Sequence, residues 1–434
     1  TAYEYDALNR VTAEIAPNGG KIVYAYDCVG NLIETTDALG HTTTYSYDAA
    51  GNLIGMTDAL GQAVGLEYDK NGRVTTAIQK NGGVLATAYD KAGRVISETD
   101  ANKHTTRYRY GKTGLVSEIT DALGQKALFE YDALGNVTKI TAPGNAVTQY
   151  AYDISGRLTT QTDATGLVTE YGYDENSQLI SVVTNGNESL YEYDAMGNVS
   201  SVTDAEGRCV KLTYDLNGNL TEIIYPDGTK DVTEYDALGR VVQSTPRTGL
   251  ATAYAYDESG NVVRMTQGEQ TTSYEYDLLG RMVRQIAADG TETAYAYDAL
   301  GNLVGQTDEL GNQTTFSYTA ESLLEQVTYA NGASQSLSYD LAGNIIGETD
   351  AEGNAKQYQY DKANRLIAVV DELGGKTSYA YDAMDHIVQV TDALRHATKY
   401  TYDKDGNLTS ETDALGHRVQ YAYTPEGWLS SVTK

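Results

Sequence analysis

The sequence predicts an all-β protein of tandem β-hairpins that form one long coiled β-sheet, a hollow shell or tubular superhelix. Three observations predict this fold. A Tyr-Asp pair returns every 20 or 21 residues through the whole chain of 434 residues, and few repeats alter its Asp. Aromatic residues stand at i and i+2, which share one face of a strand. Turn signals of the form Asp-x-x-Gly follow about every ten residues, as in alternating strands and turns.

The strands are predicted by columns of similar residues. Each repeat is numbered from the Tyr of its Tyr-Asp pair, as position 1. This position is Tyr in all 21 repeats, from Tyr5 to Tyr423. A second aromatic column at position 20 includes Tyr24 and both Phe residues of the chain, Phe129 and Phe316. Position 7 is apolar and position 11 is Thr, Ile or Val in every repeat, which suits a pleated surface.

The first turn of each repeat is predicted at positions 2–5. Asp at position 2 can accept hydrogen bonds from backbone N–H groups ahead of it, and Gly at position 5 supplies a positive φ. This pattern predicts a three-residue hairpin loop with a Gly bulge. The structural signature is predicted to lie at Tyr26, Asp27, Gly30, Tyr47, Asp48, Gly51, Tyr131, Asp132, Gly135, Tyr297, Asp298 and Gly301.

Five repeats replace the Gly of position 5. Asn and Asp tolerate the left-handed region best among the other residues, whereas Ser fits less well. The substitutes are Asn9, Ser177, Ser322, Asn364 and Asp385.

The odd period of 21 requires one irregularity in each repeat. Two identical turns with regular strands between them would place some facing residues on opposite sides of the sheet. Either one turn differs or one strand carries a bulge. The second turn, at positions 12–15, is the favoured place, because both one-residue deletions fall there, at Thr184–Ser189 and Thr266–Gln270. It also tolerates Lys103, Asn145 and Arg395 where Gly is usual.

The repeats are expected to form one uninterrupted array over residues 1–434, a fragment of a longer array. Two strands in each repeat give about 40 strands, a ribbon on the order of 200 Å long and ~20 Å wide. No helical segment is available to cover either face, so the ribbon must coil and touch itself. Pairs such as Ala59-Leu60 and Ala122-Leu123 at the hairpin tips are predicted to supply apolar contact.

Composition excludes some classes of function. The net charge of −29 opposes binding to a nucleic-acid backbone, which needs Lys and Arg. No apolar run reaches the 18 residues of a membrane span. Cys28 and Cys209 occupy different columns about nine repeats apart, so no disulfide is expected.

The candidate chemical sites have simpler structural interpretations. His41, His104, His396 and His417 share position 16, and a surface metal site at the last two is conceivable, but residues flanking a turn in solvent explain them better. The Asp columns suit turn formation better than a Ca²⁺ ladder, since calcium needs six to eight converging oxygens. Trp428, alone at position 6, favours a surface substitution or contact with a following segment. No nucleophile or phosphate-loop motif occurs, so the sequence predicts no enzyme, cofactor or metal.

The segment "YAYDCVGNLIETTDALGHTTTYSYDAAGNL" (Tyr24–Leu53) resembles the YD repeat, also called the Rhs repeat, and "YPDGT" (Tyr225–Thr229) is typical of that family. The resemblance covers all 21 repeats. Members include bacterial Rhs polymorphic toxins, the C components of Tc toxins, wall-associated proteins and animal teneurins. The family's repeats form a spiralling sheet that closes into a hollow shell, which in the toxins encloses a toxic C-terminal domain.

The resemblance implies a structural shell wall of a large exported bacterial protein, at the cell surface or outside the cell. The expected partners are an encapsulated toxin domain or other repeats of the same protein, and glycans or cell-surface receptors. The sequence shows no self-cleaving end segment, plug or toxin domain, so the cargo is implied only. An acidic lumen would suit a basic cargo, which is a weaker hypothesis. The alternative is an adhesion, glycan-binding or fibre module, because rows of exposed Tyr can stack on sugars.

Overall fold

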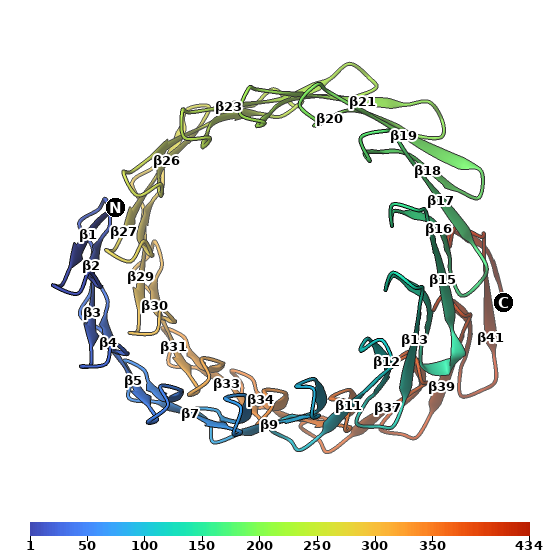
Figure 1. Cartoon of the computed structure of the whole chain (residues 1–434), viewed down its shortest axis with the longest axis horizontal. Coiled ribbons are helices and arrows are strands. Elements are labelled where there is room, and N and C mark those ends of the chain that lie inside the picture. Colours follow the sequence, from blue (N-terminus) through green and yellow to red (C-terminus); the bar gives the residue numbers. More distant parts are fainter. The chain divides into compact units, whose positions relative to one another are not determined.

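The computed structural model describes residues 1–434. Its regular elements are 42 β-strands and one three-residue 3-10 turn, η1 (Pro143–Asn145). The strands are assigned to one 42-stranded sheet, and their pairings are antiparallel. The predicted all-β fold with two strands in each repeat is therefore confirmed (Figure 1). No helix has the length or the apolar character needed to cross a membrane.

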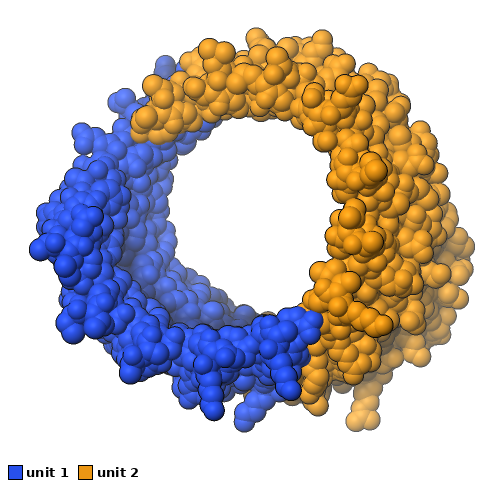
Figure 2. Space-filling model, viewed as in Figure 1, with its two compact units in different colours: residues 1–103, 241–245, 249–355 blue, residues 104–240, 246–248, 356–434 orange.

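The chain divides into two compact units, drawn blue and orange in Figure 2. Unit 1 comprises residues 1–103, 241–245 and 249–355, and unit 2 comprises residues 104–240, 246–248 and 356–434. The N-terminal stretch of unit 1 contains β1 (Ala2–Tyr5), β2 (Val11–Ile15), β3 (Lys21–Tyr26), β4 (Leu32–Thr36), β5 (Thr42–Tyr47), β6 (Leu53–Thr57), β7 (Ala63–Tyr68), β8 (Val74–Ile78), β9 (Val84–Tyr89) and β10 (Val95–Thr99). Its C-terminal stretch contains β24 (Val241–Thr245), β25 (Thr252–Tyr256), β26 (Val262–Gln267), β27 (Gln270–Tyr276), β28 (Met282–Ile286), β29 (Glu292–Tyr297), β30 (Leu303–Thr307), β31 (Gln313–Tyr318), β32 (Leu324–Thr328), β33 (Ser334–Tyr339) and β34 (Ile345–Thr349).

Unit 2 has the same construction. Its N-terminal stretch contains β11 (Thr105–Tyr110), β12 (Val116–Thr120), β13 (Lys126–Tyr131), β14 (Val137–Thr141), β15 (Val147–Tyr152), β16 (Leu158–Thr162), β17 (Val168–Tyr173), β18 (Leu179–Thr184), β19 (Asn187–Tyr193), β20 (Val199–Thr203), β21 (Cys209–Tyr214), β22 (Leu220–Ile224) and β23 (Lys230–Tyr235). Its C-terminal stretch contains β35 (Ala355–Tyr360), β36 (Leu366–Val370), β37 (Lys376–Tyr381), β38 (Ile387–Thr391), β39 (Ala397–Tyr402), β40 (Leu408–Thr412), β41 (Arg418–Tyr423) and β42 (Leu429–Thr433).

The strand register places the Tyr of position 1 opposite the apolar residue of position 7, as predicted. Tyr47 faces Leu53 across β5 and β6, and Tyr26 faces Leu32 across β3 and β4. The same strands continue into the next hairpin through the second turn. The apolar column at position 7 therefore lies beside the aromatic column all along the array.

The irregularity lies in a strand, and the preference for the second turn was wrong. Ser46 pairs with Gly55 while Tyr47 pairs with Leu53, so Ile54 at position 8 has no partner across the hairpin. The two turns themselves share one pattern of backbone hydrogen bonds. Asp48 N donates to Asn52 O at 2.9 Å in the first turn, and Asp58 N donates to Gln62 O at 2.9 Å in the second. A bulge after the first turn absorbs the extra residue and keeps facing residues on one side.

The one-residue deletions leave this register unchanged. In the shortened turn between β18 and β19, Asn185 and Gly186 both have positive φ, 50° and 79°, as in a two-residue type I′ hairpin. Ser181 at position 9 still pairs there with Leu190, three residues before the next Tyr-Asp pair, which is the place of position 19 in the 21-residue repeats. Lys103 and Arg395, which replace Gly in other second turns, adopt a φ of 67°.

The sheet is a single layer with almost no buried core. The accessible surface is 25416 Å², whereas a compact globular protein of 46.9 kDa exposes about 16,000 Å². The buried apolar residues are only alanines, Ala13, Ala101, Ala146 and Ala368. Strand pairing and contacts within the hairpins must therefore supply most of the stability.

In unit 1 the sheet stacks on itself through its hairpin tips. The tips of second turns between β2 and β10 meet the tips of first turns between β27 and β34. These two stretches are the blue and the yellow-to-orange ribbons that lie side by side in Figure 1. Asn18 Nδ2 donates to Leu278 O at 3.2 Å, and Asn81 Nδ2 donates to Leu341 O at 3.2 Å, each across 260 residues. Asn102 Nδ2 donates to a carboxylate oxygen of Asp340 at 2.9 Å. These repeated contacts form a seam between the two stretches of the unit.

Unit 2 has an equivalent seam. Second-turn tips of β14–β19 meet first-turn tips of β37–β42, and a cavity of about 650 Å³ lies between them, beside Thr165 and Asp403. Asn185 donates a hydrogen bond to the Glu426 carboxylate across this seam. Contact between hairpin tips was predicted, and the structure has it. The predicted apolar character of the contact is weak, because the tips are joined mostly by hydrogen bonds and the side chains of Leu60 and Leu123 remain 49% and 37% exposed.

Candidate functional site

The first turn is organised by the carboxylate of position 2. Asp48 Oδ1 accepts hydrogen bonds from the backbone N–H groups of Ala50 and Asn52, both at 2.9 Å. Asp48 Oδ2 accepts a third from Asn52 Nδ2 at 2.9 Å, and Gly51 completes the turn with a φ of 86°. The side chain and the backbone of one loop therefore bind each other.

These hydrogen bonds favour the charged form of the carboxyl group. The bond from the Asn52 side chain, followed by that from its backbone N–H, lowers the pKa of Asp48 below its ordinary value. The Arg73 side chain has the same effect on the pKa of Asp69. Ionised turn carboxylates thus stabilise the fold, and the acidity of the chain is partly a consequence of its turns.

A pH dependence follows for Asp48→Asn. The native pKa lies below the unfolded value of about 3.9, so the carboxylate contributes stability above about pH 4 and loses it as the pH falls through the native pKa. We expect the variant to melt below the wild type at pH 7, and the difference to shrink as the solution is acidified to about pH 2. Melting curves followed by circular dichroism measure this. A difference that stays constant with pH contradicts the assigned role.

The hydroxyl group of the position 1 tyrosine binds the preceding repeat. Tyr297 Oη donates to the backbone carbonyl of Met282, at position 7 of the repeat before, at 2.8 Å. Phe, which lacks this donor, occurs only at position 20, in Phe129 and Phe316. The same bond is made by Tyr26, Tyr47, Tyr68, Tyr89, Tyr131, Tyr152, Tyr173, Tyr193, Tyr235, Tyr256, Tyr276, Tyr318, Tyr339, Tyr381 and Tyr402.

The hydroxyl contribution can be measured within one strand. Tyr297→Phe should destabilise its region by about 1 kcal/mol, because the Met282 carbonyl loses its donor while the ring remains. Tyr295→Phe, two residues away in β29 at position 20, is the matched control and should cost less than half of that amount. Local hydrogen exchange and thermal unfolding report both effects. Equal losses of stability in the two variants would show that the hydrogen bond from Tyr297 to the Met282 carbonyl adds no measurable stability.

Position 6 links neighbouring first turns. Arg281 Nε donates to Asp277 Oδ2 at 2.7 Å within its own turn, and Arg281 Nη1 donates to the Asp298 carbonyl of the next repeat at 3.1 Å. Its guanidinium also lies over the ring of Tyr297, 4.8 Å from the centroid. This role of position 6 was not predicted from the sequence, although the signal is there, since the column is mostly Arg or Asn.

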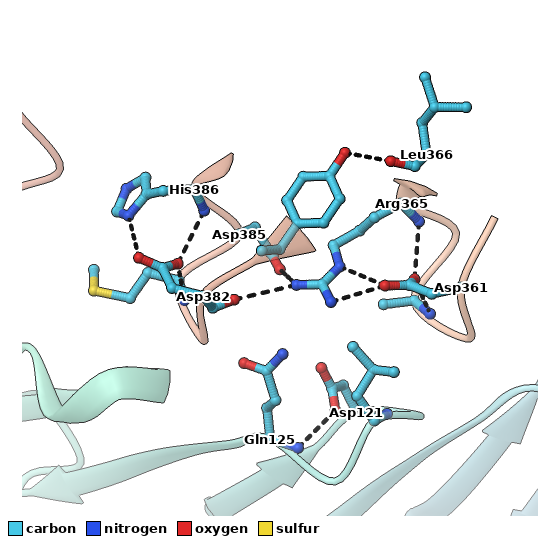
Figure 3. Close-up of polar contacts among 12 residues, drawn as sticks. Asp121, Gln125, Asp361, Arg365, Leu366, Asp382, Asp385 and His386 are labelled. Atoms are coloured by element: carbon cyan, nitrogen blue, oxygen red, sulfur yellow. Dashed lines mark hydrogen bonds and ion pairs between the residues drawn. The ribbon is translucent and has the colours of Figure 1, made fainter. Parts of the chain in front are cut away.

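Position 6 also supports three of the five residues that replace Gly at position 5, namely Ser177, Ser322 and Asp385. Figure 3 shows Arg365 between Asp361 and the next turn, where its guanidinium reaches the Asp382 carbonyl and, at 2.6 Å, the Asp385 carboxylate. Asp385 has a φ of 67°. Arg157 likewise donates to Ser177 Oγ, and Asn302 to Ser322 Oγ, both at 3.2 Å. A hydrogen bond from the preceding repeat therefore accompanies each of these left-handed residues.

The signature glycines have the conformation that the sequence predicts. The φ values of Gly30, Gly51, Gly135 and Gly301 are 101°, 86°, 92° and 87°. Gly51→Val should therefore cost about 1–2 kcal/mol, confined to the neighbouring repeats, because a β-branched residue is strained at this φ. Hydrogen exchange around residues 46–55 measures it, with Ala50→Val in the same loop as control. Unchanged protection in several such glycine variants would contradict the turn structure.

The other signature residues take equivalent places. The carboxylates of Asp27, Asp132 and Asp298 each accept hydrogen bonds from their own loops, and each preceding tyrosine binds the repeat before it. The structure thus brings the three signature residues of a repeat together around one turn. It does not bring the four sets together into one site.

The histidines act as turn residues. The Nδ1 atoms of His41, His396 and His417 lie 2.9, 3.1 and 2.8 Å from the carboxylate of position 12 in their own second turns. The structure contains no group of three or more His, Cys, Asp or Glu side chains that could hold a metal ion. Cys28 and Cys209 are both free thiols, and Trp428 is 73% exposed.

Comparison with family models places these columns in a known repeat. The RHS repeat matches residues 26–63, 155–189, 173–208, 193–230, 235–272, 297–334, 339–375, 360–397 and 402–434, more than half of the chain. The chain belongs to the RHS-repeat family. The teneurin YD-shell model also matches, over residues 62–151. No curated protein matches the chain.

Solved structures with a similar fold include Tc toxins. The Tc holotoxin pore of Photorhabdus luminescens, with a mutation in TccC3, matches at 14% identity and a TM-score of 0.52, covering 99% of this RHS-repeat chain and 30% of that chain. A second structure, titled as TcdB2-TccC3-TEV, matches at 17% identity and a TM-score of 0.38. The match covers 98% of this chain and 26% of that chain. This chain therefore spans less than a third of the length of these two.

Proposed function

We propose that this chain is a segment of the structural β-shell wall of a large exported bacterial RHS-repeat protein, which encloses and protects a C-terminal toxin or other cargo outside this segment. The observation that carries the proposal is the seam in each unit, where a single-layer sheet stacks on itself through hairpin tips. Stacking of this kind makes a wall without a second layer.

The local chemistry supports a structural role without catalysis. The Asp of position 2 accepts bonds from its own loop, Arg or Asn of position 6 binds two turns, and Tyr of position 1 binds the preceding repeat. Each side chain of the signature is thus used to hold hairpins together. The tyrosine hydroxyls that are bound in this way are not available to sugars, which leaves the glycan-binding alternative with less support.

The net charge does not by itself select a basic cargo. Much of the acidity lies in turn carboxylates, at the hairpin tips. On the strands, some of the carboxylates are paired with cations, as in Lys21 with Glu4 at 2.8 Å and Lys230 with Glu222 at 2.6 Å. We therefore propose a wall that encloses cargo and assign no charge to the cargo.

Protease protection tests the proposed enclosure. The natural full-length product, with its downstream segment, is treated with a broad-specificity protease. We expect the downstream segment to stay intact while the repeats are folded, and to be cleaved once a seam variant such as Gly20→Val opens the wall. Cleavage of that segment in the folded protein as fast as in the segment made alone would refute enclosure.

A further inference from the structure

The seam of unit 1 is held by asparagines at position 14, near the tip of the second turn. Asn81 is bound through two of its atoms, since its backbone N–H donates to Glu321 Oε1 at 3.0 Å and its Nδ2 donates to Leu341 O at 3.2 Å. Asn18 and Asn102, at the same position of other turns, also donate across the seam. To separate these tips, hydrogen bonds to the opposite stretch must be broken.

The seam of unit 2 lacks such bonds between residues 142–166 and residues 382–406. No hydrogen bond joins these two segments, and the nearest bond across the seam is that of Asn185 with Glu426. Position 14 of the first second turn in this part of the seam is Gly144, which has no side chain to donate.

The next second turn of unit 2 has Thr at position 14, and this side chain is used inside its own turn. The hydroxyl of Thr165 donates to Asp163 Oδ1 at 2.9 Å, so it has no donor left for the opposite tips. Gly144 lies against Met384, because a Cβ at Gly144 would be 3.1 Å from Met384 Cγ. A flexible methionine fixes the position of two tips less firmly than hydrogen bonds to the backbone do.

Two adjoining cavities lie at these tips. One of about 640 Å³ is bordered by residues 144–146 and residues 382–384, and the other, of about 650 Å³, lies on the far side of Thr165. Thr165 and Asp403 line both cavities, so the two meet there. Side chains that border empty space have no van der Waals partner on that side, which weakens the junction of the two stretches.

The gap lies within unit 2. Neighbouring second turns flank it at residues 121–124 and 184–187, and neighbouring first turns flank it at residues 361–364 and 424–427. It is therefore a property of the tips that face each other there. Behind the tips the strands are paired, as β14 with β15 and β38 with β39, so the stretches can part while the sheet stays paired.

We propose that the seam of unit 2 opens at this gap, between residues 142–166 and residues 382–406, while the sheet on both sides stays folded. Local opening takes place where contacts are fewest, so the seam of unit 1 at residues 79–103 stays closed under the same conditions. The gap thus acts as a gate in the wall. Its use as an exit for cargo rests on the proposed function, whereas the opening itself does not.

Distances between two spin labels across each seam, measured by double electron–electron resonance on the full chain, test this inference. The background carries serine in place of both cysteines. One labelled pair, Val168→Cys with Lys404→Cys, spans the gap of unit 2. The other pair, Val84→Cys with Ala320→Cys, has the same positions 17 and 3 in the seam of unit 1.

In rising urea, we expect the labels of unit 2 to gain a longer distance while the circular dichroism of the sheet is unchanged. The labels of unit 1 should keep one distance until the sheet unfolds, with an opening constant smaller by about tenfold or more, because hydrogen bonds cross that seam. Equal opening of the two seams, or a longer distance in unit 2 that comes only with loss of the sheet signal, would overturn the proposal.

Exchange of the residues at position 14 separates the chemistry of the tips from general stability. Thr165→Asn places the amide of the unit 1 seam beside the Pro425 backbone, which lines the same cavity, and should reduce opening about fivefold. Asn81→Thr should produce opening in unit 1. Thr165→Ser, the matched control, keeps the hydroxyl and should leave opening unchanged. Equal opening in Thr165→Asn and Thr165→Ser would refute the role of the tips, whatever the protease test of enclosure shows.

Discussion

Replacement of Lys80 by Met should destabilise the second turns of unit 1 by about 3 kcal/mol, because it leaves the Asp58 carboxylate buried without its cation. Lys80 Nζ lies 2.6 Å from Asp58 Oδ2, and the two side chains are only 16% and 4% exposed. Asp58 also accepts the backbone N–H groups of its own turn, so it cannot turn toward water without opening that turn.

Two variants separate the loss of this pair from general effects. Lys139→Met removes the cation of an exposed pair with Glu130, whose side chains are 35% and 62% exposed, and should cost less than about 1 kcal/mol. The double variant Asp58→Asn with Lys80→Met should recover part of the lost stability. Thermal unfolding measures all three variants. Hydrogen exchange is followed at residues 58–62 for the two variants that carry Lys80→Met, and at residues 130–139 for Lys139→Met. Equal effects of the two single Lys variants would contradict the burial of the Asp58 pair.

Gly20→Val should open the seam of unit 1, with a local loss of about 2 kcal/mol. A Cβ at Gly20 would lie 2.7 Å from the Leu278 carbonyl oxygen and 3.2 Å from Ala38 Cβ. The backbone oxygen belongs to the stretch that lies across the seam, so relief of the clash requires the two stretches to separate.

Gly375→Val is the matched control, since Gly375 has the same position 16 in a second turn of the C-terminal stretch of unit 2, whose second-turn tips do not make the seam. Its Cβ would meet only Asp371 and Ala393, at 2.6 and 3.0 Å. We expect hydrogen exchange at residues 277–280 to rise in Gly20→Val and to stay unchanged in Gly375→Val. No change at residues 277–280 in Gly20→Val would show that the seam does not exist in solution.

The features that the sequence predicted are those that depend on neighbouring residues. The aromatic pair at positions 20 and 1, the Asp of position 2 and the Gly of position 5 each define a strand or a turn within ten residues, and the structure has these elements. The odd period of 21 residues showed that each repeat contains one irregularity. It could not show which one, because a bulge at Ile54 and a different second turn both account for one extra residue. The deletions favoured the second turn because that loop tolerates length changes, not because it is irregular.

The contacts between repeats could not be predicted in the same way. The role of Arg281 depends on the distance to the next turn, which strand pairing sets. The seam depends on how far the sheet curves. Each strand is rotated slightly relative to its neighbour, and these rotations add up along the chain until Asn81 meets Leu341, 260 residues away. A column of exposed Leu or Asn at the tips shows that contact is possible, but not which tips meet.

An experimental density map of the chain, at a resolution that separates strands, would show whether the sheet stacks on itself through its tips. We expect a single-layer sheet in each unit, with the turn at residues 79–83 lying against the tips at residues 319–322 and 340–343. A second β-layer packed on the tyrosine face, a solid apolar core, or tips at residues 79–83 surrounded only by solvent would contradict it.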